Sequence, residues 1–130
     1  MEPLKVIHSD AAPAAIGPYS QAIEVRPGRL VFCSGQIAID PRTGAMSNQD
    51  ITRETQQVLA NLDAVLLAGA LARWNVVKTT IFLTDMADFG VVNELYGAYF
   101  GDHKPARATI AVAALPKGAR VEIEAVAMAD

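Results

Sequence analysis

Apolar and polar residues alternate over several short stretches of the chain, and this alternation predicts a fold rich in β-strands. The stretches are dense in valine, isoleucine and phenylalanine, and proline, glycine or aspartate residues bound them. A Pro27-Gly28 pair separates the second stretch from the third, so we expect a hairpin there. Before the final part of the chain, the predicted strands are residues 4–8, 19–25, 30–39 and 76–83.

A helical period replaces the alternation in two places. From residue 51 to about 68, apolar residues recur at the spacing of one helical stripe, with Asp50 as the expected N-cap and Gly69 just past the end. A second stripe is expected to begin at Asp88 as its cap and to stop at Gly101. A long helix between two strands is typical of a right-handed crossover connection.

The last stretch, residues 105–128, reads as two strands around a turn at 115–118, where a proline and a glycine favour a reversal. Alternation places Arg107 on one face of the first strand. On the second strand, Glu122 and Glu124 share the polar face. If these strands pair as a hairpin, a guanidinium and a carboxylate line one cleft.

The resulting order of elements is β-β-β-α-β-α-β-β within one domain, residues 1–130. This pattern indicates an α/β (α+β) fold with a mixed sheet and two helices on one face. Charged residues make up 19% of the chain and hydrophobic residues 52%, whereas about 25% charged residues is typical of a soluble domain. The uncovered sheet face is therefore expected to meet another subunit in an oligomer.

Composition also bounds the partners and the compartment. The formal net charge is −3 and the basic residues are dispersed, which disfavours a nucleic-acid groove. No apolar run approaches the roughly 18 residues of a membrane span. The single cysteine, Cys33, and the lack of a signal-like start favour the cytoplasm. His8 and His103 have no partners at ligand spacing, so no metal site is expected.

Arg107 is the first candidate for chemistry, because Pro105 precedes it and small or apolar residues flank it. A guanidinium in such a setting binds a carboxylate strongly. From these residues alone, a structural or interface arginine is the more frequent case. Glu122 and Glu124 lie about 7 Å apart on one strand face, where one can pair with an arginine while the other activates water. A solvated strand edge explains these two glutamates equally simply.

Weaker candidates are polar residues at irregular positions. Tyr19 follows a Gly-Pro turn and is either a presented hydroxyl or a packing anchor. Ser34-Gly35 interrupts a strand, which indicates a bulge or a close approach to the backbone. Asn93 lies among apolar residues of the second helix, where it caps, bridges or faces water.

Several segments, taken together and in order, resemble a known family over essentially the whole chain. They are Ile16-Gly17-Pro18-Tyr19-Ser20-Gln21-Ala22, Ser34-Gly35-Gln36-Ile37, Asn61-Leu62, Val77-Lys78-Thr79-Thr80, Asp88-Phe89 with Val92-Asn93, Pro105-Ala106-Arg107, and the last turn with Val121-Glu122-Ile123-Glu124. The set closely resembles the RidA/YjgF family of imine deaminases. The resemblance implies a chorismate-mutase-like fold and a homotrimer with active sites in the clefts between subunits.

The resemblance also implies a role for particular residues. Arg107 matches the arginine that binds the substrate carboxylate, and Glu122 matches the glutamate that positions or activates water. The matching substrate-binding positions are Tyr19, Ser34, Gly35, Asn93, Thr109 and Pro116. Many members carry cysteine where Thr109 stands, and the segment 101–104 is shorter than in some members, which bears on the rim of the site and on substrate size.

The implied reaction is hydrolysis of 2-imino acids, such as the tautomer of 2-aminoacrylate, to 2-keto acids and ammonia without a cofactor. Such imines arise as by-products of pyridoxal-phosphate enzymes. A non-catalytic trimer that binds small carboxylates in the same cleft has the same sequence features. A mutase-type isomerase fits less well, because one arginine beside two glutamates suits a monocarboxylate. A ribonuclease or translation-inhibitor role agrees least with the charge distribution.

Overall fold

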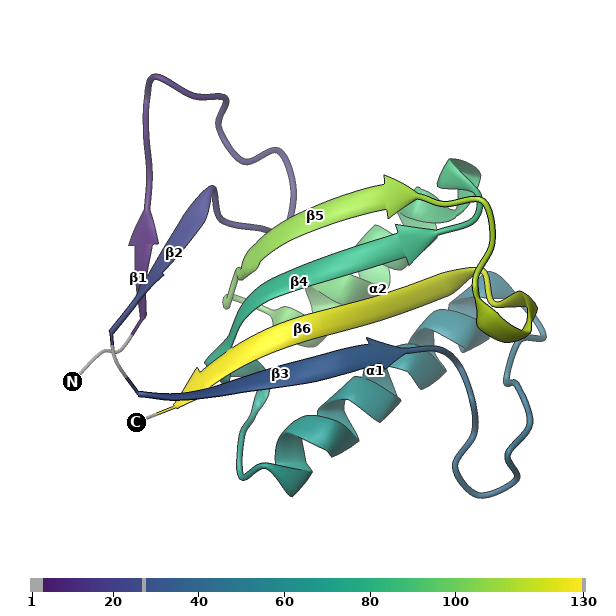
Figure 1. Cartoon of the computed structure of the whole chain (residues 1–130). Helices are drawn as coiled ribbons and strands as arrows, with labels where there is room; N and C mark the ends of the chain where they lie inside the picture. Colours follow the sequence, from purple (N-terminus) through teal and green to yellow (C-terminus); the bar gives the residue numbers. More distant parts are fainter. Residues whose placement is uncertain (1–3, 27, 130) are drawn as a thin grey trace.

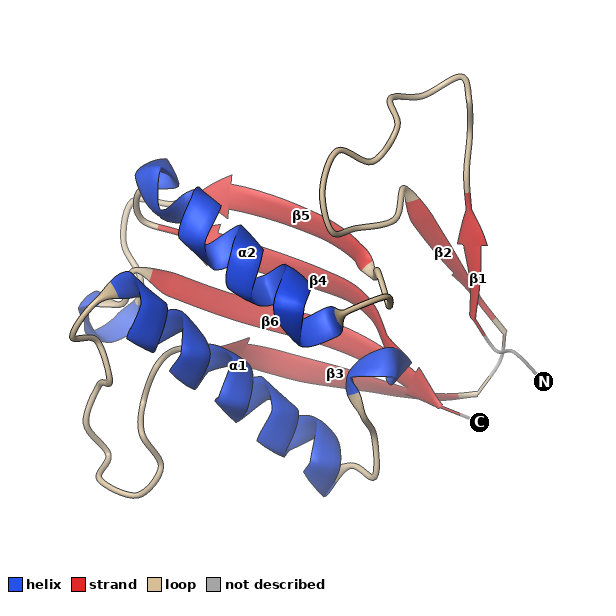
Figure 2. Cartoon of the chain, turned by 180° about the vertical axis from the view of Figure 1, so that it is seen from behind, coloured by secondary structure: helices blue, strands red, loops and turns tan. Residues whose placement is uncertain are grey.

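A four-stranded mixed sheet forms the centre of the fold, and both helices cover the same face of it (Figures 1 and 2). The computed structural model describes residues 4–26 and 28–129. The strands are β3 (Arg29–Gln36), β6 (Val121–Ala129), β4 (Val76–Leu83) and β5 (Ala106–Ala111), in that spatial order, and the helices are α1 (Ile51–Ala68) and α2 (Phe89–Phe100). This arrangement confirms the predicted fold class and the predicted order of elements.

The expected hairpin between the second and third strands is wrong. Strands β1 (Leu4–Ile7) and β2 (Ala22–Val25) pair with each other as a separate antiparallel sheet, and β3 pairs with β6 instead. Pro27, in the expected turn, lies outside the described residues. An isolated β-bridge between Ser20 and Ala106 joins this N-terminal part to the edge of the main sheet.

The expected hairpin between the last two strands is also wrong, because β4 lies between β5 and β6. Strand β5 is parallel to β4, as the connection through α2 requires, and β6 is antiparallel to both β3 and β4. The last strand is flanked on both edges, which suits its regular alternation: Val121, Ile123 and Ala125 are buried, whereas Glu122 and Glu124 are not. Two short 3₁₀ turns, Met86–Asp88 before α2 and Pro116–Gly118 before β6, complete the connections at one end of the sheet, and a third, Arg73–Asn75, precedes β4.

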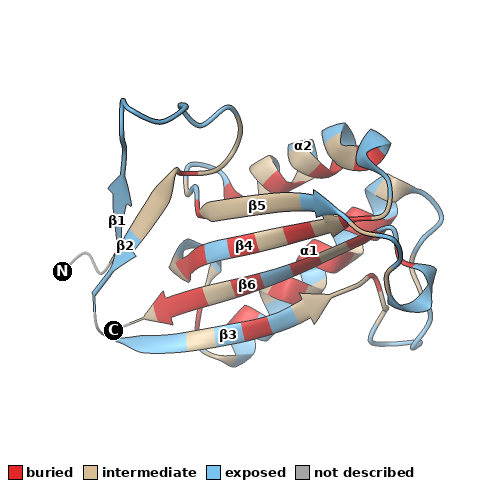
Figure 3. Cartoon of the chain, turned by 45° about the horizontal axis from the view of Figure 1, so that its top comes forward, coloured by how far each residue is buried: buried red, intermediate tan, exposed pale blue. Residues whose placement is uncertain are grey.

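The core lies between the sheet and the helices. Val58, Leu62 and Leu66 of α1 are fully buried, as are Ile81 and Ile123 on the facing strands. Each such side chain contributes about 1.5–3 kcal/mol relative to exposure. Figure 3 shows the buried residues along β4 and β6, while β1 and the start of β3 are exposed. None of the helices within the described ranges is both long and apolar enough to cross a membrane.

The ends of the helices match the predictions in part. Asp50 caps α1, accepting a hydrogen bond from the Arg53 amide at 2.7 Å. The helix ends at Ala68, as predicted, but the left-handed residue after it is Ala70, with a φ of 59°, and not the expected Gly69. The amide of Leu71 donates to the carbonyl of Leu66 and that of Ala70 to Leu67, which is a Schellman motif.

We expect Ala70→Gly to stabilise the protein. A left-handed conformation costs a non-glycine residue roughly 1–2 kcal/mol, of which the greater entropy of glycine in the unfolded state returns about half, so the net gain is about 0.5–1 kcal/mol. Chemical denaturation of wild type and variant measures it. As a control, Ala64→Gly, at an exposed position inside α1, is expected to destabilise the protein by about 0.5–1 kcal/mol. A lower midpoint for Ala70→Gly contradicts the assignment of the strained position.

Candidate functional site

Arg107 lies on the helix-facing side of β5. Its cross-strand partner on β4 is Thr79, which is fully buried on that side. The guanidinium is half-buried, and its Nη1 donates to Asn93 Oδ1 of α2 at 2.7 Å. Three aromatic rings surround it: the Cζ atom lies 5.2 Å from the ring centre of Tyr19, 5.7 Å from Phe89 and 5.1 Å from Tyr96. The structure therefore brings together Arg107, Asn93 and Tyr19, as the sequence analysis expects.

The charge of Arg107 has no carboxylate partner within the described part of the chain, where the ion pairs involve other residues. Burial lowers the pKa of the guanidinium below its ordinary value, although an arginine in a protein stays protonated. Because Asn93 occupies one N–H group of five, donors remain for a ligand. A partly buried cation among aromatic rings is a site that favours a small anion, above all a carboxylate.

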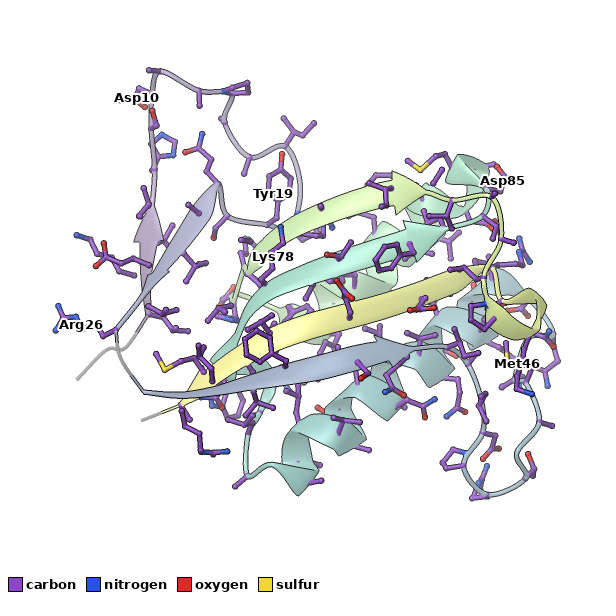
Figure 4. The ribbon with its side chains drawn as sticks, in the orientation of Figure 1. Asp10, Tyr19, Arg26, Met46, Lys78 and Asp85 are labelled. Atoms are coloured by element: carbon purple, nitrogen blue, oxygen red, sulfur yellow. The ribbon has the colours of Figure 1, made fainter. Side chains whose placement is uncertain are left out.

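A cavity of about 340 Å³ opens beside this guanidinium. Its lining residues are Ile16, Gly17, Tyr19, Met86, Phe89, Asn93, Arg107 and Thr109. Thr109 lies two residues beyond Arg107 on the same face of β5, and its buried hydroxyl has no hydrogen-bond partner among the described residues. The hydroxyl of Tyr19 accepts a hydrogen bond from the Ile16 amide at 3.3 Å, which fixes the loop over the cavity. Figure 4 shows Tyr19 in this loop, beside β5.

Phe89 and Tyr96 are site residues that the sequence reasoning missed. It assigned both to the apolar stripe of the second helix, where an aromatic residue is most often a core residue. The Tyr96 hydroxyl lies 2.7 Å from Thr79 Oγ1, and burial raises the pKa of Tyr96 to about 12, so the phenol is neutral near pH 7. Their seven-residue separation, with Asn93 between them on the same helix, is the signal that places them beside Arg107.

Glu122 lies on the opposite face of the sheet. Its cross-strand partner is Phe82, whereas the adjacent pair, Ile81 and Ile123, is buried under the helices. Glu124, opposite Thr80, shares the uncovered face with Glu122. The single-chain cleft expected to hold both Arg107 and Glu122 is therefore wrong, because the sheet itself separates the two side chains. The spacing of Glu122 and Glu124 allowed one of them to pair with an arginine, but the arginine nearest in sequence, Arg120, pairs with Asp88 instead.

The Ser34-Gly35 irregularity belongs to the side of Glu122. The register of β3 against β6 shifts between Cys33 and Gln36, which confirms a bulge at Ser34 and Gly35. A Cβ atom on Gly35 would overlap the carboxylate of Glu122, so the expected close approach is also present. Backbone at residue 35 and the Glu122 carboxylate thus form a second cluster, separate from the cavity of Arg107.

Replacing Gly35 with alanine is expected to displace the Glu122 carboxylate without unfolding the protein. The overlapping atoms are at the end of a flexible side chain, so rotation of Glu122 relieves the clash. If Glu122 acts in catalysis, we expect a loss of activity on the order of 10–100-fold, with a change in stability below about 1 kcal/mol. Steady-state kinetics and thermal unfolding measure the two effects. Gly90→Ala is the matched control, because no atom lies within 4 Å of its added Cβ. Equal activity in both variants contradicts a role for this contact.

Two further expected positions lie apart from the cavity of Arg107. Pro116 is exposed, begins the turn before β6, and is not among the cavity's lining residues. Residues 102–104 of the short segment line a different cavity, of about 560 Å³, together with residues of β1 and β2. The Nε2 atom of His103, in this segment, lies 2.6 Å from the carbonyl oxygen of Val76. Within the described ranges, no three histidine, cysteine, aspartate or glutamate residues are grouped to hold a metal ion.

Comparison with known proteins places the chain in a family. Residues 9–129 match the sequence model of the family described as endoribonuclease L-PSP. Protein DfrA of Myxococcus xanthus is 54% identical over 95% of this chain and 95% of its own length. The 2-iminobutanoate/2-iminopropanoate deaminase of Mus musculus is 52% identical over 95% of this chain and 90% of its own length. The crystal structure of the YjgF gene product from E. coli has a TM-score of 0.74 at 42% identity, with 97% of this chain and 99% of that chain covered. The chain therefore belongs to the RidA/YjgF family, the group that the endoribonuclease L-PSP model describes.

Proposed function

We propose that this protein is an imine deaminase that hydrolyses 2-imino acids to 2-keto acids and ammonia. The observation that carries the proposal is the half-buried Arg107 guanidinium, held by Asn93 and open to a cavity without a carboxylate partner among the described residues. A 2-imino acid provides that carboxylate, bonded directly to its reactive imine carbon. The name of the mouse relative, a 2-iminobutanoate/2-iminopropanoate deaminase, supports the same substrate class.

The reaction follows from holding the substrate by its carboxylate. Arg107 binds the two carboxylate oxygens through parallel N–H···O bonds, and this contact orients the imine carbon toward a water molecule. Glu122 accepts a proton from that water as its oxygen attacks the carbon. Glu122 returns this proton to the former imine nitrogen, which gives the carbinolamine. The hydroxyl proton of the carbinolamine then moves to the nitrogen, the C–N bond breaks, and ammonia leaves as the carbonyl forms. Water supplies the oxygen of the product, so the reaction needs no oxidant, reductant or cofactor.

The separation of the two groups by the sheet requires a second copy of the chain. We propose a homotrimer in which Arg107 of one subunit and Glu122 of its neighbour complete each site. The uncovered face that carries Glu122 is apolar enough for such an interface: Phe32 is 76% exposed, Leu30 49% and Ile110 45%. We propose that a second copy of this chain covers this sheet face, because the same copy also supplies the missing half of the site.

The main competing function is a trimer that binds small carboxylates in the same cavity without turning them over. The geometry of Arg107 serves both functions, so only turnover distinguishes them. The decisive assay generates 2-aminoacrylate in situ with a pyridoxal-phosphate serine dehydratase and follows the keto acid spectroscopically, with and without this protein. We expect acceleration. No acceleration across a panel of amino-acid-derived imines, together with binding of 2-oxobutanoate, would replace catalysis by carboxylate binding.

A further inference from the structure

Several contacts converge on Arg120, the residue immediately before β6. Its guanidinium donates twice to Asp88, from Nη2 to Oδ1 at 2.7 Å and from Nε to Oδ2 at 3.2 Å. Its backbone carbonyl accepts a hydrogen bond from the Thr84 amide at 3.2 Å. Its own amide donates to Glu54 Oε2 at 2.7 Å, and the Val121 amide donates to the same oxygen at 3.2 Å. The start of β6 is thus attached to α1, to the end of β4 and to the start of α2.

Glu54 is the buried anchor of these contacts. The residue has no exposed surface, and its Oε2 accepts hydrogen bonds from two consecutive backbone amides. A buried carboxylate with backbone donors fixes the position of those amides, since moving them leaves a charge unpaired. The first residues of β6 therefore have little freedom to shift along or across the sheet.

Asp88 forms the ion pair instead of capping a helix. The sequence pattern predicts this residue as the N-cap of α2, yet among the described residues no side chain caps that helix. A lost cap costs roughly 1 kcal/mol, and a partly exposed ion pair returns at most about the same. The side chain of Asp88 is 11% exposed and that of Arg120 45%. The free energy of folding therefore gives little reason for Asp88 to form the ion pair rather than the cap. The elements that the ion pair connects provide another reason.

Within each subunit the pair connects two elements that contribute to different sites of the proposed trimer: α2 contributes to the site of its own Arg107, and β6 contributes to the site of a neighbour. Asp88 immediately precedes α2, which supplies Phe89 and Asn93 to the cavity of Arg107. Arg120 lies two residues before Glu122, and the Glu122 side chain is on the sheet face that the helices leave uncovered. This inference rests on the proposed function: we infer that Asp88 and Arg120 are positioning residues for imine hydrolysis. Their bidentate pair, anchored by Glu54, fixes the start of β6, which carries Glu122 to one site, and the start of α2, which carries Asn93 to another.

The test compares Asp88→Asn, Arg120→Met and the double variant by steady-state kinetics with in situ generated 2-aminoacrylate. We expect each single variant to lower kcat about tenfold, because small displacements of a catalytic group are costly. The double variant should be no worse than the singles, since the pair acts as one unit. Arg120→Lys, which keeps the charge, should recover part of the loss. In Asp88→Asn we also expect the acid limb of the kcat–pH profile, which reports the group that activates water, to shift.

The matched control is Asp40→Asn, because Asp40 makes an equivalent bidentate pair with Arg42 and is in contact with neither Arg107 nor Glu122 through a hydrogen bond or ion pair of the described residues. This variant should keep wild-type kcat and pH profile. Wild-type kcat and pH profile in Asp88→Asn and Arg120→Met, with an active wild type, would overturn the positioning role alone. A loss of kcat that only follows a loss of folded protein at the assay temperature would overturn it as well. An inactive wild type would overturn the proposed function itself.

Discussion

Replacing Arg107 with alanine is expected to abolish imine hydrolysis while the chain stays folded. The guanidinium is half-buried and makes one side-chain hydrogen bond, to Asn93, so its removal leaves the core intact. The substrate carboxylate then enters a cavity lined by aromatic rings with no cation to pair with. Truncating one partner of a buried charge pair costs about 2–5 kcal/mol, which lowers kcat/KM by about 30-fold to 5,000-fold. Keto acid formation from in situ generated 2-aminoacrylate measures the loss.

Three further variants test whether the loss of activity in Arg107→Ala comes from the lost contact with the substrate carboxylate. Arg107→Lys keeps the charge without the planar fork and should retain partial activity, since it cannot form two parallel hydrogen bonds. Arg42→Ala, at an exposed turn, should have wild-type activity. Glu122→Gln should be impaired comparably or less than Arg107→Ala, because binding and orientation persist. Full activity in purified Arg107→Ala would refute the assignment of the site.

Replacing Phe32 with aspartate is expected to abolish both assembly and activity, although it leaves Arg107 and Glu122 in place. Phe32 is 76% exposed in one chain and lies beside Val126 on the uncovered face of the sheet. In the proposed trimer this side chain is buried, and a carboxylate there loses about 2 kcal/mol of apolar burial and adds a desolvation cost of several kcal/mol. We expect a monomer by light scattering and a loss of activity of about 100-fold or more, because a monomer brings no Glu122 to Arg107.

The matched control for Phe32 is Leu67→Asp. Leu67 is 64% exposed on α1, on the helical layer rather than on the uncovered sheet face. This variant should keep the oligomeric state and the activity of the wild type. A monomeric but fully active Phe32→Asp variant would show that one chain carries a complete site.

Local features of the fold could be predicted from the sequence. Helix α1 and strand β4 have the predicted bounds, since helical and alternating periods are properties of neighbouring residues. The bulge at Ser34-Gly35 was predictable for the same reason, because a glycine inside a strand weakens regular pairing.

Pairing between distant segments could not be predicted from the sequence. Alternation shows that β5 and β6 each have two faces, but not that β4 lies between them. Consequently, the sequence did not reveal that Arg107 and Glu122 lie on opposite sides of the sheet. The prediction that Asp88 caps α2 is wrong, because a capping aspartate and an ion-pairing aspartate cannot be distinguished in the sequence. The ion-pair partner, Arg120, is also distant along the chain.

The most direct test of the central claim, that each site combines Arg107 of one subunit with Glu122 of another, is complementation. Arg107→Ala and Glu122→Gln proteins are unfolded and refolded together in equal amounts, and imine hydrolysis is measured. In a homotrimer with sites between subunits, about one quarter of the junctions are fully wild type, because each of their two sides has a chance of about one half. We therefore predict about one quarter of the wild-type activity. Activity no greater than that of the two variants refolded separately would contradict the account, because a site within one chain is never restored by mixing.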